Sequence, residues 1–198
     1  MKNIFLFNAI LLFALAFQSC QTADKKSATT KDSVAGDTTM VNGVHETGSE
    51  STESKLDAKG SDFLKTAAVG GLMEIEAAKI AQASSKNTQV KDFATLMLAD
   101  HTKANMELKA LATNKKIIVP DSLPDMERNH LNAMKKMSGA EFDKHYMDMM
   151  LTDHDKTVKL FTQGSENRDV DLKNFALSTL KVIKEHDSLA KQIVPKLK

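Results

Sequence analysis

The sequence predicts an all-α domain: an antiparallel four-helix bundle with a short extra helix in the link between the second and third helices. From residue 61 onward, four segments carry apolar or small residues at alternating spacings of four and three, which is the period of one helix face. Each segment has about 22 to 26 residues, or roughly 35 Å as a helix. Short turns make the first and second segments, and the third and fourth, antiparallel neighbours.

The first three helices have recognisable limits. The first is expected to begin at Ser61, and the second at Thr88 after a short turn. The third is expected to open with a capping box, in which Ser138 and Glu141 satisfy backbone N–H groups of the first turn. Gly164 is expected to end it.

The fourth helix is expected from Asp171 onward, with Pro195 as its stop. The link between helices two and three, residues 114–138, contains Pro120 and Pro124 and a short helical stretch, 124–137. Spacing alone leaves two paths open for this link, which either returns along the bundle or caps one end.

The N-terminus reads as an export signal over residues 1–19. Lys2 precedes an apolar run, 4–17, that is shorter than the roughly 20 residues of a membrane-spanning helix. The run leads directly to Cys20, an arrangement that resembles a bacterial lipobox, in which the signal is cut before the cysteine and the cysteine is lipidated. The alternative is an ordinary secretory signal with Cys20 left over.

Residues 20–60 are expected to be a lipidated cysteine followed by a tether, and residues 61–198 the folded domain. The tether is rich in Ser, Thr, Asp, Glu, Lys and Gly and has no aromatic residue or apolar period. The chain is therefore expected in the cell envelope, held to a membrane by its lipid on the periplasmic side or at the outer membrane.

Composition excludes several kinds of partner and site. The 198 residues include 27 Lys and Arg against 26 Asp and Glu, for a net charge of +1. Such a balance argues against a nucleic-acid partner. The single cysteine allows neither an internal disulfide nor a thiolate metal cluster, so a metal would be held by His and carboxylate. A protein partner is not indicated by any pattern.

One polar residue interrupts the apolar face of each predicted helix near its midpoint, and these four residues are Glu74, His101, His154 and His186. Midpoints share one height in an antiparallel bundle, so the four side chains are expected to converge in one layer. Imidazole and carboxylate ligands suit Fe, Zn, Cu or Mn. The sequence predicts a site for a single divalent transition metal.

An acidic residue directly precedes each core histidine: Asp100, Asp153 and Glu185. One position earlier lies about 100° around the helix, where a carboxylate can orient a neighbouring helix's imidazole. The alternative is that these acids pair with lysines. Tyr146 lies two turns before His154 on nearly the same face and is expected to join the polar group or to be a partly buried phenol.

His130 and His145 fall off the apolar faces and are expected at the surface. The core histidines themselves have two interpretations. They bind a metal, or they form a closed hydrogen-bonded network with Glu74 without one, because burying such groups without partners is costly.

A family resemblance adds to this interpretation. The residues that carry it are Gly70-Gly71-Leu72-Met73-Glu74, Asp100-His101, Phe142-Asp143 with Tyr146, Asp153-His154 and His186. They resemble the domain of unknown function 4142 family of exported bacterial proteins, which implies a ferritin-like four-helix domain and no established reaction.

The chain departs from di-iron ferritin-like proteins, which carry Glu three residues before His. Leu98 and Ile183 occupy those positions here, so both bridging carboxylates are missing and a mononuclear site is favoured. The sequence shows no catalytic constellation and favours a binding protein over an enzyme. The two functional hypotheses are a metal-binding envelope lipoprotein for storage, sensing or protection, and a non-catalytic structural or interaction module with a buried His/Glu network.

Overall fold

The computed structural model describes residues 56–197 of the chain. Its elements are α1 (Ala58–Ser84), α2 (Thr88–Asn114), α3 (Asp125–Met134), α4 (Gly139–Gly164), α5 (Val170–Ile193) and the 3-10 helix η1 (Val194–Lys196). These residues contain no strand, which confirms the all-α prediction. The expected signal, Cys20 and most of the expected tether lie outside the described residues. Within 56–197, no helix is both long and apolar enough to cross a bilayer.

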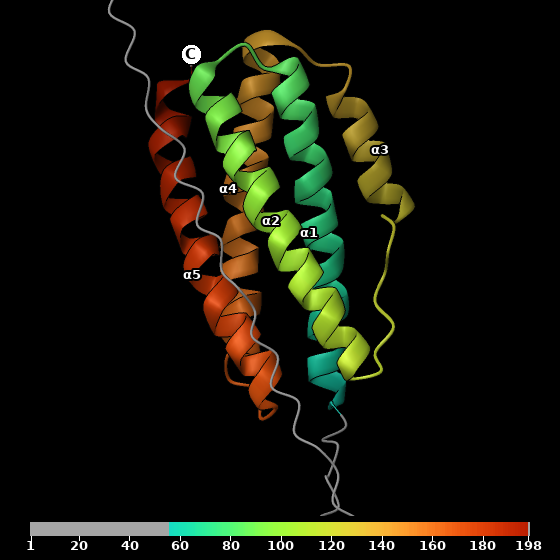
Figure 1. Cartoon of the computed structure of the whole chain (residues 1–198). Coiled ribbons are helices and arrows are strands. Elements are labelled where there is room, and N and C mark those ends of the chain that lie inside the picture. Colours follow the sequence, from blue (N-terminus) through green and yellow to red (C-terminus); the bar gives the residue numbers. More distant parts are fainter. Residues whose placement is uncertain (1–55, 198) are drawn as a thin grey trace, which may run out of the picture. The chain divides into compact units, whose positions relative to one another are not determined.

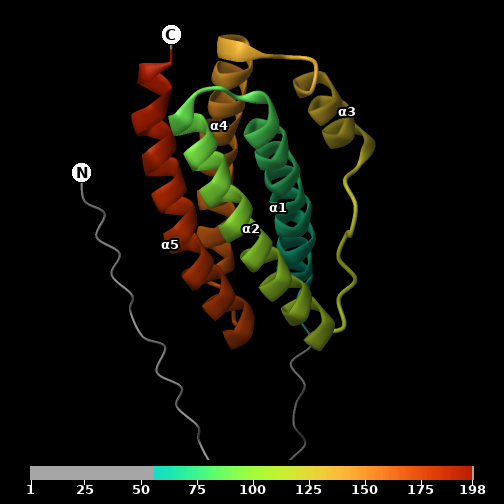
Figure 2. The same cartoon turned by 45° about the horizontal axis from the view of Figure 1, so that its top comes forward.

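The four long helices form an antiparallel bundle (Figure 1, Figure 2). α1 packs on α2 and α4, and α5 packs on the same two helices. Because α2 and α4 run in the same direction, the link between them returns along the length of the bundle, with α3 beside α1 and α4. One long crossover of this kind is the ferritin-like topology. The predicted bundle with an extra helix is therefore confirmed. Of the two paths that the sequence left open for the link, the chain takes the one along the bundle.

α1 begins at Ala58, three residues before the expected start at Ser61. The side chain of Asp57 caps it by accepting a hydrogen bond from the N–H of Gly60 at 2.7 Å. Leu56 is 7% exposed and packs in the core. The folded domain therefore includes residues 56–60, which the sequence assigned to the tether.

The capping box expected at the start of α4 does not form. Ser138 is the N-cap residue, but its side chain makes no capping hydrogen bond, and Glu141 is exposed. The reason lies in Gly139, whose φ of +58° is left-handed and turns the backbone away from the helical path that a capping box requires. α3 is also shorter than expected and ends at Met134.

The apolar core of the bundle has two parts. One cluster uses α1 from Met73 onward and α2 up to Met97. The other uses α1 up to Ala68 and α2 from Leu108 onward. The polar layer lies where the two clusters meet and consists of Glu74, His101, His154 and His186.

Candidate metal centre

Each long helix contributes one side chain to the polar layer: Glu74 from α1, His101 from α2, His154 from α4 and His186 from α5. All four are buried, and His154 is 0% exposed. The three imidazole rings form a triangle with centroid separations of 5.3, 5.5 and 5.7 Å. The four residues that the sequence placed at one height therefore lie together in the folded chain.

Each imidazole has an oxygen partner for one of its two nitrogens. His101 Nδ1 lies 3.0 Å from Glu74 Oε2, and His186 Nε2 lies 2.9 Å from Asp100 Oδ2. His154 Nδ1 lies 2.9 Å from the carbonyl oxygen of Met150. Carboxylate and carbonyl oxygens only accept hydrogen bonds, so each of these nitrogens carries the proton and donates it.

The second nitrogen of each neutral ring then presents a lone pair. His154 Nε2 and His186 Nδ1 are two such nitrogens, and they face each other at 3.5 Å. Neither has a proton to donate to the other, so the two lone pairs face each other without a hydrogen bond between them. A metal ion with bonds of about 2.0–2.1 Å holds two imidazole nitrogens roughly 3.3 Å apart in tetrahedral geometry.

His101 completes the group. One ring nitrogen from each histidine lies within 4.8 Å of the others, and His101 Nε2 is buried without a hydrogen-bond partner. Glu74 lies behind His101 and is not a member of this group. Its Oε1 also lies 3.5 Å from His154 Nδ1. A carboxylate in this place can orient a ligating imidazole, and its expected role as a fourth ligand stays a prediction.

Burial and charge set the protonation of Glu74 and His101. Burial alone would raise the pKa of Glu74, but the charge and hydrogen bond of His101 outweigh it and the pKa is lowered. Burial opposes the charged form of His101, yet the Glu74 carboxylate raises its pKa above the ordinary value. Without a metal these two residues form a buried ion pair, and His101 has to lose its Nε2 proton before that nitrogen can bind a metal.

The other two histidines are held neutral. Burial is the main cause that lowers the pKa of His154, and the charge of His101 adds to it. Burial also lowers the pKa of His186 to about 4, against the opposing hydrogen bond from Asp100. Neutral imidazole is the form that binds a metal, so two of the three rings are already in that form at neutral pH.

The acids that precede the core histidines have three different environments. Asp100 is half-buried and hydrogen-bonds to His186 of the neighbouring helix. Asp153 pairs with Lys156 at 3.0 Å, which is the alternative interpretation of its position. Glu185 is exposed, so it does not lie beside a core imidazole. Only Asp100 among these three takes the orienting position.

Tyr146 is fully buried, not partly buried at the bundle end. Its ring packs against Phe93 with a centroid separation of 6.3 Å, and Phe93 in turn packs against His186. Its hydroxyl group has no hydrogen-bond partner. Burial, with a smaller effect from Glu74, raises the pKa of the phenol, so Tyr146 stays protonated beside the polar layer.

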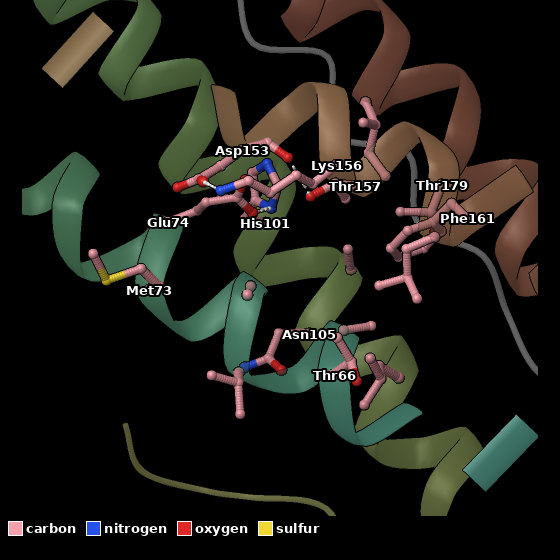
Figure 3. Close-up of a pocket in the computed structure, with 18 of the residues that line it drawn as sticks. Thr66, Met73, Glu74, His101, Asn105, Asp153, Lys156, Thr157, Phe161 and Thr179 are labelled. Atoms are coloured by element: carbon pink, nitrogen blue, oxygen red, sulfur yellow. Dashed lines mark hydrogen bonds and ion pairs between the residues drawn. The ribbon is translucent and has the colours of Figure 1, made fainter. Parts of the chain in front are cut away.

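Two cavities include His101 in their lining. The larger, about 520 Å³, is bounded by residues of all five helices and includes Glu74 and His101 in its lining (Figure 3). The smaller, about 220 Å³, lies against α2 and α5 and includes Asp100, His101 and His186. The polar layer is therefore open to small molecules, a property that the sequence did not reveal.

Sequence reasoning missed a second histidine pair. His130 of α3 and His145 of α4 are half-buried, and their Nε2 atoms lie 3.2 Å apart. The pair exists because α3 docks against α4, and the periodicity of either helix carries no signal for that docking. Sequence reasoning also missed Asn105, which lies one turn after His101. Its side-chain Oδ1 is buried without a hydrogen-bond partner.

Comparison with known proteins agrees with the fold. A crystal structure of a DUF305 fragment from Deinococcus radiodurans superposes with a TM-score of 0.64 at 8% sequence identity, and the match covers 72% of this chain and 99% of the fragment. At this identity the likeness concerns the fold alone. No curated protein matches the sequence. The family described as "Domain of unknown function (DUF4142)" matches residues 45–193, which is most of the chain. The chain therefore belongs to the DUF4142 family.

Proposed function

We propose that this protein binds a single divalent transition-metal ion through His101, His154 and His186. The observation that carries the proposal is the approach of His154 Nε2 and His186 Nδ1 to 3.5 Å, while the other nitrogen of each ring donates to an oxygen. Two lone pairs converge in a buried layer, and His101 Nε2 supplies a third when the ring gives up its second proton to an incoming metal. Removing such groups from water without a cation would be costly.

The chain's own residues supply the rest of the site. Glu74 and Asp100 fix the tautomers of His101 and His186, as carboxylates do behind metal-bound imidazoles. Three neutral nitrogen ligands suit Zn, Fe, Cu or Mn, and they leave at least one coordination position for water or another small ligand. The ion would supply Lewis acidity or simple binding, and we assign the protein to metal storage, sensing or protection.

The setting that we propose is the cell envelope. The apolar run that ends before Cys20 supports a lipid on this cysteine, with residues 20–60 as the tether and the membrane as the partner. The near-neutral charge supports the absence of a nucleic-acid partner. A metal-binding domain on a tether samples the space next to the membrane that holds it.

The test is the metal content of protein purified without a His-tag and then incubated with Fe, Zn, Cu or Mn. Elemental analysis should find about one equivalent bound to the wild type, and His154→Gln should reduce this below about one tenth. Bound metal should raise the melting temperature, because a ligand at about 100 times its dissociation constant adds about 2.7 kcal/mol to stability.

The control removes the other histidine pair. The double variant His130→Gln and His145→Gln lacks the half-buried imidazoles of α3 and α4, which lie outside the polar layer. It should keep the single equivalent and the shift in melting temperature. A wild type that binds none of the four metals, or equal losses in both variants, would overturn the metal proposal and leave the buried hydrogen-bond network in its place.

A further inference from the structure

The larger cavity has the size and chemistry of a site for an organic molecule. Its volume of about 520 Å³ falls within the range of about 300–1,000 Å³ typical of small-molecule sites. Its walls include Phe161, Phe175 and Leu108, from the apolar cluster on one side of the polar layer. In Figure 3, Glu74 and His101 lie together, and Asn105 lies apart from them near Thr66.

Gly70 and Gly71 in α1 border this cavity. A Cβ atom added at either glycine would meet nothing within 4 Å, so no neighbouring helix requires the missing side chains. Each glycine inside a helix costs about 1 kcal/mol relative to Ala. Their effect is to keep open the space beside α1, which any larger side chain would occupy.

Three residues that line this space have a buried side-chain oxygen that lacks a hydrogen-bond donor. Glu74 Oε1, Asn105 Oδ1 and Glu127 Oε2 are buried acceptors without a partner, and all three residues line the cavity. Glu74 Oε1 lies 3.5 Å from His154 Nδ1, which leaves Asn105 as the more available acceptor. A buried acceptor without a donor costs about 1–3 kcal/mol, and a bound hydroxyl group would remove this cost.

Charge excludes anionic ligands. The carboxylates of Glu74, Glu127 and Asp153 line the cavity, and its one lysine, Lys156, already pairs with Asp153 at 3.0 Å. Glu74 is balanced in the same way by His101. A carboxylate or phosphate would therefore meet the carboxylate of Glu127 and no unpaired lysine or arginine in this lining. An uncharged hydroxyl group on an apolar body matches both the walls and the free acceptors.

We propose that the cavity binds an uncharged aromatic or aliphatic alcohol of phenol size, whose hydroxyl group donates to Asn105 Oδ1 and whose apolar body lies over Gly70 and Gly71. This site borders the metal centre and does not depend on it. The bound alcohol would lie next to His101, which lines the same cavity.

The test compares three probes of similar size: 4-butylphenol, its methyl ether 4-butylanisole, and 4-butylbenzoate. Binding to the full mature chain is measured by calorimetry at neutral pH in EDTA. The phenol should bind at least about fivefold tighter than the ether, because only the phenol satisfies the buried acceptor. The benzoate should bind more weakly than either. Equal affinities for the three probes would overturn the proposal.

Two variants locate the site. Gly70→Leu should abolish binding of the phenol and the ether, whereas Ala83→Leu, which adds the same bulk at an exposed position of α1, should leave both unchanged. Asn105→Leu should keep ether binding and remove the preference for the phenol. This variant tests the site even if Gly70→Leu fails to fold. Equal responses to the two leucine variants, or an unchanged preference in Asn105→Leu, would place binding elsewhere.

His154→Gln separates this proposal from the metal proposal, because His154 does not line the cavity. It should lose the metal and keep the phenol. A wild type that binds the phenol but takes up no metal would support the cavity and overturn the metal centre. A wild type that takes up metal but does not bind the phenol would do the opposite.

Discussion

Carboxylates decide which nitrogen of a buried imidazole is free. Asp100 accepts from His186 Nε2 at 2.9 Å and leaves Nδ1 facing His154. Without this acceptor, nothing opposite Nε2 would hold the proton of a neutral His186 there, and the tautomer protonated on Nδ1 would turn a donor toward the metal group. The side chain of Asp100 therefore controls the site from outside it.

The first prediction follows from that role. Asp100→Asn should weaken metal binding about 10–100-fold, because an amide can offer its NH₂ group to the ring and stabilise the wrong tautomer. Glu185→Gln is the matched control: Glu185 also directly neighbours a core histidine in sequence, but its side chain is exposed. Competition titration with a chelating dye measures both. Equal affinities in the two variants would contradict the orienting role of Asp100.

The second prediction concerns acid. The pKa of His186 is lowered from 6.5 to about 4 in the folded chain, whereas in the unfolded chain it returns to about 6.5. Between these values the unfolded state binds more protons, so the free energy of unfolding should fall as pH drops from about 6.5 to about 4. His154 acts in the same direction.

His101 acts in the opposite direction, because its raised pKa adds stability that is present below about pH 6.5 and lost as pH rises through the folded value. Urea unfolding in EDTA from pH 7 to 4.5 measures the net change in the free energy of unfolding that the three histidines produce. His186→Gln should flatten the decline, and Thr179→Val, at a buried position of the same helix that does not titrate, should keep it. An identical pH slope in both variants would show that His186 is not its cause.

Helical period predicted the four members of the polar layer, because a residue's height and angle on a straight helix follow from its number alone. The partners of these residues could not be predicted in the same way. Asp100 and Glu185 both precede a histidine by one position, yet one contacts a neighbouring helix and the other faces solvent. That outcome depends on which helix packs on each side.

At the scale of the element, the helical glycines differ in their surroundings. A Cβ at Gly70 would meet nothing within 4 Å, whereas a Cβ at Gly164 would lie 2.5 Å from the ring of Phe63. That ring packs edge-on against Phe161 at a centroid separation of 5.0 Å, so it has little room to move. The same substitution should therefore have opposite effects at the two positions.

The third prediction is this reversal of sign. Gly70→Ala should raise the free energy of unfolding by about 1 kcal/mol through helix propensity, and Gly164→Ala should lower it by about 1–3 kcal/mol through overpacking. Chemical denaturation of the metal-free chain measures both changes. A loss of stability in Gly70→Ala would mean that α1 needs the glycine for its packing, and would remove the support that the open space gives to the cavity.

Helix ends were harder to predict than helix interiors. The expected start at Thr88 is confirmed, and the side chain of Asn87 caps this helix by accepting from the N–H groups of Gln89 and Val90. The start of α1 was missed because Leu56 is a lone apolar residue in a polar stretch. Its burial depends on the second apolar cluster, which forms only when the helices have assembled.

The fourth prediction tests this start. A chain that begins at Lys55 should unfold with the stability of the full mature protein, whereas one that begins at Ser61 loses Leu56 and the cap from Asp57. Those losses are worth about 1.5–3 kcal/mol for the buried leucine and about 0.5–2 kcal/mol for the cap. Melting curves of the two truncated chains should differ accordingly. Coincident curves would show that residues 56–60 do not stabilise the folded domain and belong to the tether.

At the scale of the whole molecule, the bundle combines two dry apolar clusters with a polar layer and cavities between them. The apolar clusters can hold the four helices together without help from the layer, because burial of apolar area dominates stability. This arrangement leaves the layer free to carry groups that are costly to bury. A metal ion or proton lost from it changes the centre of the bundle and not its ends.

The fifth prediction concerns how the whole chain is held in the cell. The apolar run that ends before Cys20 predicts cleavage before this residue and a lipid on its sulfur. Intact mass of the membrane-fraction protein should match residues 20–198 plus a diacylglycerol-type adduct, and Cys20→Ser should lack the adduct. Ser27→Ala, in the expected tether, should keep both the adduct and the membrane location. A wild type found in the soluble periplasmic fraction with no lipid mass would favour the ordinary secretory signal. The metal and cavity proposals would stand unchanged, because they rest on residues beyond 56.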